Sequence, residues 1–120
     1  MWRLPLVAAT LAALTLNNFT PVQALDIPER FQPLIAIVGW EPADVPMLAA
    51  VVACESGWNS LAVGAAGELG LAQIMPSTWE NAQTYSDSPD IEHWMSPAAN
   101  LYTAHEIKDQ YGWSQWSCAQ

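Results

Sequence analysis

One acidic residue, Glu55, stands where its surroundings favour unusual chemistry. It ends an apolar run and is followed by a glycine-rich loop and a Gly-Leu-Ala-Gln segment at 70–73. The negative end of a helix dipole and apolar neighbours both disfavour an ionised carboxylate, so they favour an acid that keeps its proton. Protonation of a glycosidic oxygen requires such an acid. On these residues alone the alternative is a helix-end glutamate that faces water, as most charged residues do.

The residues before Glu55 predict the helix that would position it. A helix over 45–56 can carry Pro46 in its first turn, take Asp44 as N-cap and end at Gly57. Its side chains are apolar almost all round, which is typical of a helix buried on nearly every side.

Several motifs follow this helix in a fixed order. They are Glu-Ser at 55–56, Trp-Asn at 58–59, GLAQIMPSTW at 70–79 and SPAANL at 96–101. Together they resemble the soluble lytic transglycosylase (SLT) domain, a goose-lysozyme-like group that cleaves peptidoglycan, and the resemblance covers residues 30–116. The family's usual Ala-Tyr-Asn motif near the C-terminus is absent, so the sequence leaves open how the acetamido group of the substrate is held.

The chain ends instead with GWSQWSC at 112–118. This ending is similar to resuscitation-promoting factors and to some phage and actinobacterial SLT relatives, in which two cysteines pair. The resemblance therefore implies a disulfide between Cys54 and Cys118, with free buried thiols as the alternative. The disulfide would close a loop of about 65 residues and stabilise the fold by roughly 4 kcal/mol.

The resemblance places catalysis on Glu55 and implies a sugar contact for Gln73. The predicted substrate-binding residues are Ser56, Gln73, Asn100, Trp58 and Trp94. Asn100 lies inside the last predicted helix, where a buried hydrogen bond is the alternative role. For Trp58 and Trp94 the alternative is packing in the core.

Other aromatic and histidine residues are assigned to the fold and its surface. Trp40 and Trp79 are predicted to lie in the core. His93 and His105 lack the spacing of metal ligands, so we predict surface positions for both, with no metal and no cofactor.

The first residues have the pattern of an export signal. A short basic start, an apolar segment over 4–16 and Val-Gln-Ala at 22–24 predict a secretory signal peptide at 1–24. The apolar segment is too short for an ordinary membrane-spanning helix, although an uncleaved anchor is the alternative. We therefore expect a secreted, periplasmic or cell-wall protein with no stable membrane insertion after cleavage.

Charge limits the possible partners. The chain has 3 basic and 12 acidic residues and a formal net charge of −9. Nucleic acids and anionic membranes both require a basic surface, so neither is expected to bind. The expected partner is the glycan strand of peptidoglycan, and the expected oligomeric state is a monomer.

The remaining pattern predicts an all-α, lysozyme-like SLT domain over 25–120. Helices are expected over 28–40, after a capping box at 77–80, and from an N-cap at Ser96 to Gln110, with a loop over 60–70. A substrate cleft is expected between the loop at 64–70 and the last helix.

The predicted function is a lytic transglycosylase that cleaves the MurNAc–GlcNAc β-1,4 bond and leaves 1,6-anhydroMurNAc ends. Glu55 is the one acid within the motifs, which favours assistance by the substrate over a carboxylate pair. A muramidase that hydrolyses the same bond, with Glu68 as the nearest second acid, and a non-catalytic glycan-binding cell-wall protein are the alternatives.

Overall fold

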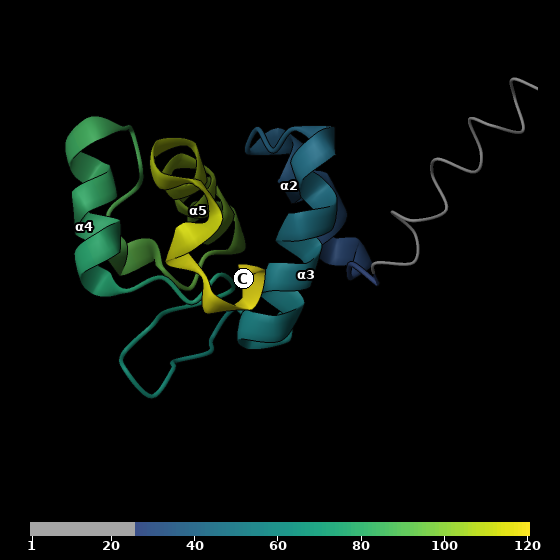
Figure 1. Ribbon diagram of the computed structural model, residues 1–120, viewed down its shortest axis with the longest axis horizontal. Helices are drawn as coiled ribbons and strands as arrows, with labels where there is room; N and C mark the ends of the chain where they lie inside the picture. Colours follow the sequence, from purple (N-terminus) through teal and green to yellow (C-terminus); the bar gives the residue numbers. More distant parts are fainter. Residues whose placement is uncertain (1–25) are drawn as a thin grey trace, which may run out of the picture.

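The computed structural model describes residues 26–120, and the predicted signal peptide lies outside them. The regular secondary structure over 26–120 is helical, with short 3-10 turns, an irregular segment over 57–75 and no strand beyond two isolated β-bridges around Leu69. No helix among these residues has both the length and the apolar character needed to cross a membrane. The α-helices are α2 (Gln32–Ile37), α3 (Val45–Ser56), α4 (Pro76–Tyr85) and α5 (Pro97–Tyr111), shown in Figure 1. The all-α prediction is confirmed.

Helix α5 forms the centre of the domain. It contacts α2 on one side and α4 on the other (Figure 1). Its start matches the prediction, because Pro97 occupies the first turn and the Ser96 hydroxyl accepts a hydrogen bond from the Ala99 N–H. Its buried residues are small or apolar except for two polar side chains. They are Ala99, Asn100, Leu101, Thr103, Ala104 and Ile107.

Helix α3 has the predicted bounds but a different beginning. Gly57 ends it with φ +61°, and its backbone N–H bonds to the carbonyls of Val52 and Ala53. Asp44 makes no side-chain cap, since a 3-10 turn, η2 (Pro42–Asp44), leads directly into the helix. The Asp44 carboxylate instead lies 2.8 Å from the Lys108 ammonium. That hydrogen bond is the largest cause of a raised Lys108 pKa.

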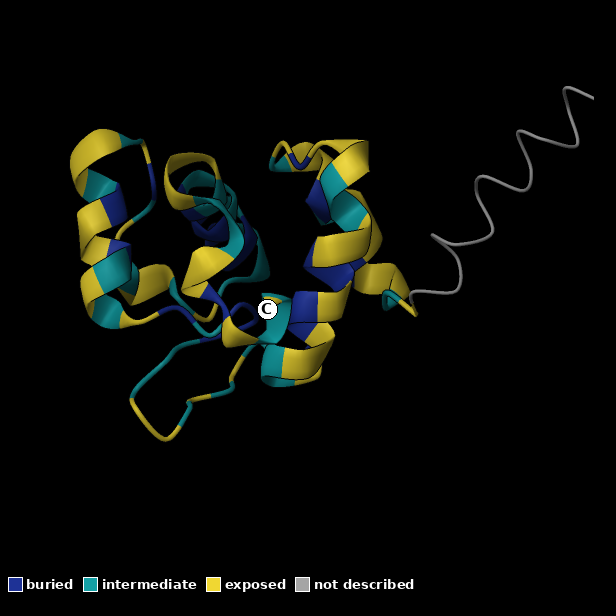
Figure 2. Ribbon diagram, in the orientation of Figure 1, coloured by how far each residue is buried: buried dark blue, intermediate teal, exposed yellow. Residues whose placement is uncertain are grey.

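The prediction that α3 is buried on nearly every side is wrong. Leu48, Ala49, Val51 and Val52 face the core, while Met47 is 38% exposed and Ala50, Ala53 and Cys54 are exposed as well (Figure 2). Two of the five exposed residues of α3 are alanines, whose small apolar area costs little in water. Counting apolar residues around a helix does not distinguish alanine from larger side chains.

Two other boundaries differ from the prediction. The expected capping box is absent because α4 already begins at Pro76, which puts Ser77 inside the first turn. The segment over 28–40 divides into a 3-10 turn, η1 (Glu29–Phe31), and the shorter α2, which packs on α5.

Buried tryptophans join distant parts of the chain. Trp40 and Trp79 lie in the core as predicted, with exposed fractions of 4% and 0%. Their indole N–H groups donate to the carbonyls of Leu101 and Pro89. The indole of Trp116 donates to the carbonyl of Ala72 over 2.8 Å, which holds the chain end against the 70–73 segment. Each of these three indoles thus satisfies its one donor, whereas the buried Trp58 Nε1 makes no hydrogen bond within the described residues.

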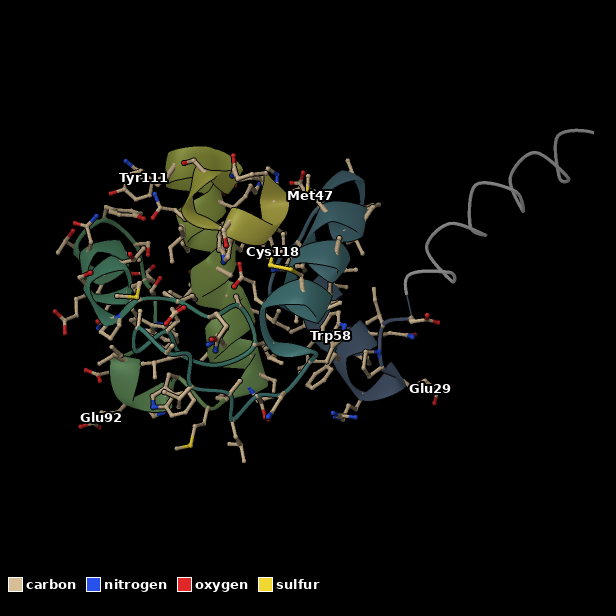
Figure 3. The ribbon with its side chains drawn as sticks, turned by 60° about the horizontal axis from the view of Figure 1, so that its bottom comes forward. Glu29, Met47, Trp58, Glu92, Tyr111 and Cys118 are labelled. Atoms are coloured by element: carbon tan, nitrogen blue, oxygen red, sulfur yellow. A yellow bond between two sulfur atoms is a disulfide. The ribbon has the colours of Figure 1, made fainter. Side chains whose placement is uncertain are left out.

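The disulfide between Cys54 and Cys118 is present, with the two Cα atoms 6.0 Å apart. It links α3 to the last 3-10 turn, η5 (Ser117–Ala119), and Figure 3 shows the bond beside Cys118. The last turn makes its main contacts with α3, so the bond fixes the chain end beside Glu55.

We expect the Cys54→Ser/Cys118→Ser double variant to unfold at a markedly lower temperature. The unfolded chain regains the freedom of a loop whose ends are 64 residues apart. About 4 kcal/mol of lost stability corresponds to a fall in Tm of roughly 15–30 °C for a domain of this size. Thermal unfolding by circular dichroism measures the change. An unchanged Tm, or two alkylatable thiols in the native wild-type protein, would contradict the assignment.

Candidate active site

A pocket of about 230 Å³ opens where α3, the 64–75 segment, α4, α5 and the chain end meet. Its polar lining includes Glu55, Glu68 and Gln73. Its apolar and remaining polar lining comes from Ala66, Ile74, Met75, Thr78, Ile107, Gln115, Trp116 and Ser117. The predicted cleft between the 64–70 loop and the last helix is thus present, with the chain end after α5 as a further wall.

Glu55 is half-buried on the last turn of α3. Its Oε2 atom lies 3.4 Å from the backbone N–H of Cys118, which donates to it. That donor is held by the disulfide, because Cys118 is bonded to the residue that precedes Glu55. The side chain therefore has one contact to the chain end and an open side toward the pocket.

Two of the predicted substrate-binding residues make their hydrogen bonds within the protein. The Ser56 hydroxyl lies 2.7 Å from the Leu71 carbonyl and 3.2 Å from the Val52 carbonyl, and it has one proton to donate. Asn100 is fully buried, accepts from the Ala72 N–H, and donates to the carbonyls of Leu69 and Trp94. Of the two readings of Asn100, the structure shows the buried hydrogen bond.

Gly70 is needed for this arrangement. Its φ of +76° is a left-handed conformation, and a Cβ there would collide with the Asn100 amide and come within 2.8 Å of the Trp94 carbonyl. The backbone at 69–72 therefore lies directly on the Asn100 side chain. Glycine at this position lets α5 support the floor of the pocket.

Gln73 lines the pocket and has a strained backbone, with φ +48°. Its Nε2 donates to the carbonyls of Ala62 and Gly70 over 3.1 and 3.0 Å. Both amide protons are thereby used, and Oε1 is the polar atom left to accept a hydrogen bond from a bound sugar. Such strain is typical of functional positions.

Glu68 stands beside Gln73 on the loop. Its Oε1 accepts from the Ala66 N–H over 2.7 Å. A Cβ built on Gly64 would lie 2.6 Å from both Glu68 Oε1 and Gln73 Oε1, so these two oxygens are no more than twice that distance apart. Glu68 thus adds a second carboxylate to the pocket, and it was not among the predicted site residues.

The two tryptophans predicted as sugar platforms do not line the pocket. Trp58 is 7% exposed and stacks on Phe31 with ring centroids 5.4 Å apart, on the side of the domain near η1 (Figure 3). Trp94 is half-buried against the core, and its carbonyl receives the Asn100 amide. For both residues the structure shows the core-packing alternative.

The chain end supplies pocket residues that the sequence reasoning missed, namely Gln115, Trp116 and Ser117. The signal for them was present in the cysteines. Pairing Cys118 with Cys54 brings the residues just before Cys118 close to Glu55. The predicted surface position of His105 is also wrong, because its side chain is only 11% exposed.

Residues 40–115 match the transglycosylase SLT domain family. This match covers more than half of the chain, and the chain belongs to that family. The domain is therefore lysozyme-like as well as all-α, and peptidoglycan lytic transglycosylase-type activity is its family's activity. SLT domains act on peptidoglycan outside the cytoplasm, and a disulfide is consistent with that location. Comparisons with curated proteins and with solved structures found no match.

We expect Asn100→Ala to destabilise the domain strongly. It leaves the Ala72 N–H and the Trp94 carbonyl without the Asn100 amide, and it leaves the Leu69 carbonyl with the Ile74 N–H alone, at about 3–4 kcal/mol in all. Urea unfolding gives the value. Asn59→Ala is the matched control, since its exposed side chain bonds only a loop N–H, and it should change stability by about 0.5 kcal/mol. Equal effects of the two substitutions would rule out the special role of Asn100.

Proposed function

We propose that this domain is a lytic transglycosylase that cleaves the MurNAc–GlcNAc β-1,4 bond of peptidoglycan, with Glu55 as both acid and base. The observation that supports the proposal best is the position of Glu55. It is half-buried, open to the pocket, and fixed by a helix end and by the disulfide-linked turn. An acid held this way is positioned to transfer a proton to a bound glycosidic oxygen.

In the first step the Glu55 carboxyl gives its proton to the glycosidic oxygen. The bond from this oxygen to C1 of MurNAc breaks, and the GlcNAc side leaves with a free hydroxyl group. The acetamido oxygen of MurNAc stabilises the positive charge that develops at C1. The single acid within the family motifs is sufficient for this step.

In the second step the Glu55 carboxylate takes the proton from the C6 hydroxyl of the same MurNAc. The C6 oxygen then bonds to C1, which closes the 1,6-anhydro ring and returns the proton to Glu55. Water takes no part. Over the two steps the bond from C1 to the glycosidic oxygen breaks and a bond from C1 to the C6 oxygen forms. Gln73 Oε1 is available to accept from an N–H or O–H group of the sugar, which would fix its position.

Hydrolysis of the same bond is the second candidate, and one observation favours it. Glu68 lines the same pocket as Glu55. A hydrolase needs its second carboxylate about 5–5.5 Å from the acid for retention, or about 6.5–9.5 Å for inversion. Glu68 would then act on the sugar face opposite Glu55, as nucleophile or as base for water.

The setting that we propose follows from the substrate. The domain at 25–120 acts as a monomer on peptidoglycan glycan strands outside the cytoplasm, after removal of the signal peptide at 1–24. No cofactor or metal enters the chemistry, because proton transfer by one carboxyl group completes both steps.

We expect Glu55→Gln to reduce cleavage of purified peptidoglycan at least about 10²-fold, because the amide keeps the shape of the side chain and cannot give up a proton in this role. Zymography and release of soluble muropeptides measure the loss. Glu80→Gln on the exposed side of α4 is the control and should keep full activity. A fully active Glu55 variant would move the chemistry to another acid. An inactive wild-type protein that sediments with peptidoglycan would favour the binding module.

The product distinguishes the two chemistries. We expect mass spectrometry of the digest to find 1,6-anhydroMurNAc ends, and Glu68→Gln to change the rate by less than about 10-fold. Reducing MurNAc ends, heavier by one water molecule, together with an inactive Glu68→Gln variant, would replace the transglycosylase by a muramidase.

A further inference from the structure

A cluster of titratable side chains lies on the face of α5 that carries His105. The His105 ring packs edge-on against Trp40, with ring centroids 5.0 Å apart, and its side chain is 11% exposed. The carboxylates of Glu41, Glu106 and Asp109 all approach this ring. None of these residues lines the catalytic pocket. The cluster is therefore separate from the proposed active site and needs its own explanation.

The contacts of His105 determine how its two nitrogens differ. Nε2 lies 3.1 Å from Glu41 Oε2, so in the neutral ring the Nε2 proton is donated to this carboxylate. Nδ1 then carries a lone pair. A carboxylate that holds the far nitrogen of a histidine is the usual support of a metal-binding imidazole, because it fixes the tautomer and the orientation of the ring.

The Nδ1 lone pair faces two carboxylates. Glu106 Oε2 is 3.4 Å from Nδ1 and Asp109 Oδ2 is 3.8 Å from it, and the ligand atoms of the three residues all lie within 4.8 Å of one another. A tetrahedral ion with bonds of about 2.1 Å keeps its ligand atoms about 3.4 Å apart. A lone pair opposed to two anions is repulsive, and either a proton on Nδ1 or a cation between the three atoms removes this repulsion. These distances leave room for a metal ion.

The other oxygen of each carboxylate is held from outside the cluster. Lys108 Nζ lies 2.9 Å from Asp109 Oδ1, and the Tyr102 hydroxyl lies 3.5 Å from Glu106 Oε1. Both carboxylates thus turn their second oxygen toward His105. Orientation by such neighbouring groups is a general feature of metal sites.

Local charge also favours a cation. Four carboxylates, those of Glu41, Asp44, Glu106 and Asp109, surround a single ammonium group, that of Lys108. Lys108 is already engaged with Asp44 at 2.8 Å and with Asp109 at 2.9 Å. The face therefore keeps an excess of negative charge, which attracts a divalent ion.

We propose that His105, Glu106 and Asp109 bind one divalent transition-metal ion, with Zn²⁺ the best-suited ion of this class. The donor set combines one imidazole nitrogen with two carboxylate oxygens, which suits zinc, and a water molecule would complete four-coordination. Mg²⁺ and Ca²⁺ prefer oxygen ligands alone and are expected to bind far more weakly. The rival explanation is a protonated His105 in an ion-pair network without metal.

The test uses the tag-free domain stripped with chelator and titrated with ZnCl₂ by calorimetry and thermal unfolding. We expect one ion per chain, and a rise in Tm of roughly 10–20 °C when free Zn²⁺ exceeds its dissociation constant 100-fold. His105→Gln should abolish both effects. His93→Gln is the matched control, since His93 is the other histidine, is exposed, and follows Asp90 and Glu92 on a 3-10 turn, so it should keep both.

Asp109→Asn provides a second variant whose fold is safe, because this carboxylate is 50% exposed. It should weaken Zn²⁺ binding at least about 10-fold while the metal-free Tm stays close to that of the wild type. Co²⁺ in place of Zn²⁺ should give the visible absorption of a tetrahedral site in the wild type alone. Absence of binding, equal binding by His105→Gln, or equal effects of MgCl₂ and ZnCl₂ would overturn the proposal. None of these readouts depends on peptidoglycan cleavage.

Discussion

The floor of the pocket depends on one buried amide. Asn100 has no exposed surface, and its three hydrogen bonds reach the backbone at Leu69, Ala72 and Trp94. A segment without regular secondary structure has many backbone groups to satisfy, and burial makes each unpaired group costly. Asn100, on the buried helix α5, satisfies three of these groups and thereby fixes the position of the glycine-rich loop. Gly70 makes the contact possible by having no side chain in the way.

The other wall of the pocket is built by the end of the chain. The indole of Trp116 bonds the Ala72 carbonyl, and the Cys54–Cys118 bridge attaches the last turn to α3. Cys54 directly precedes Glu55 in the sequence, and the disulfide holds the Cys118 N–H beside the Glu55 carboxylate. Stability and site geometry therefore rest on the same covalent bond, and the chain end has a role in the pocket that its short length would not suggest.

Much of this arrangement followed from the sequence, and the errors on Trp58 and His105 share one physical cause. The bounds of α3, the N-cap at Ser96, the disulfide and the burial of Trp40 and Trp79 depend on local chemistry or on motifs. The burial of Trp58 and His105 depends on which elements pack against each other. Phe31 covers Trp58, and Trp40 with Glu41 covers His105, from distant positions in the chain. Composition near a residue does not report such partners.

The two carboxylates of the pocket are held by supports of different stiffness, and this difference bears on the chemistry. Glu55 is fixed by a helix end and by the disulfide, whereas Glu68 is fixed within its own loop, by the Ala66 N–H and by the space that Gly64 leaves beside it. Catalytic groups must be held within about 0.5 Å of the productive geometry, and helices achieve this better than loops do. The proposed mechanism requires this precision only of Glu55, because the substrate supplies the nucleophile. It therefore uses the carboxylate that the helix and the disulfide hold in place. Under the proposed mechanism, Glu68 orders the loop beside Gln73 and does not attack the sugar.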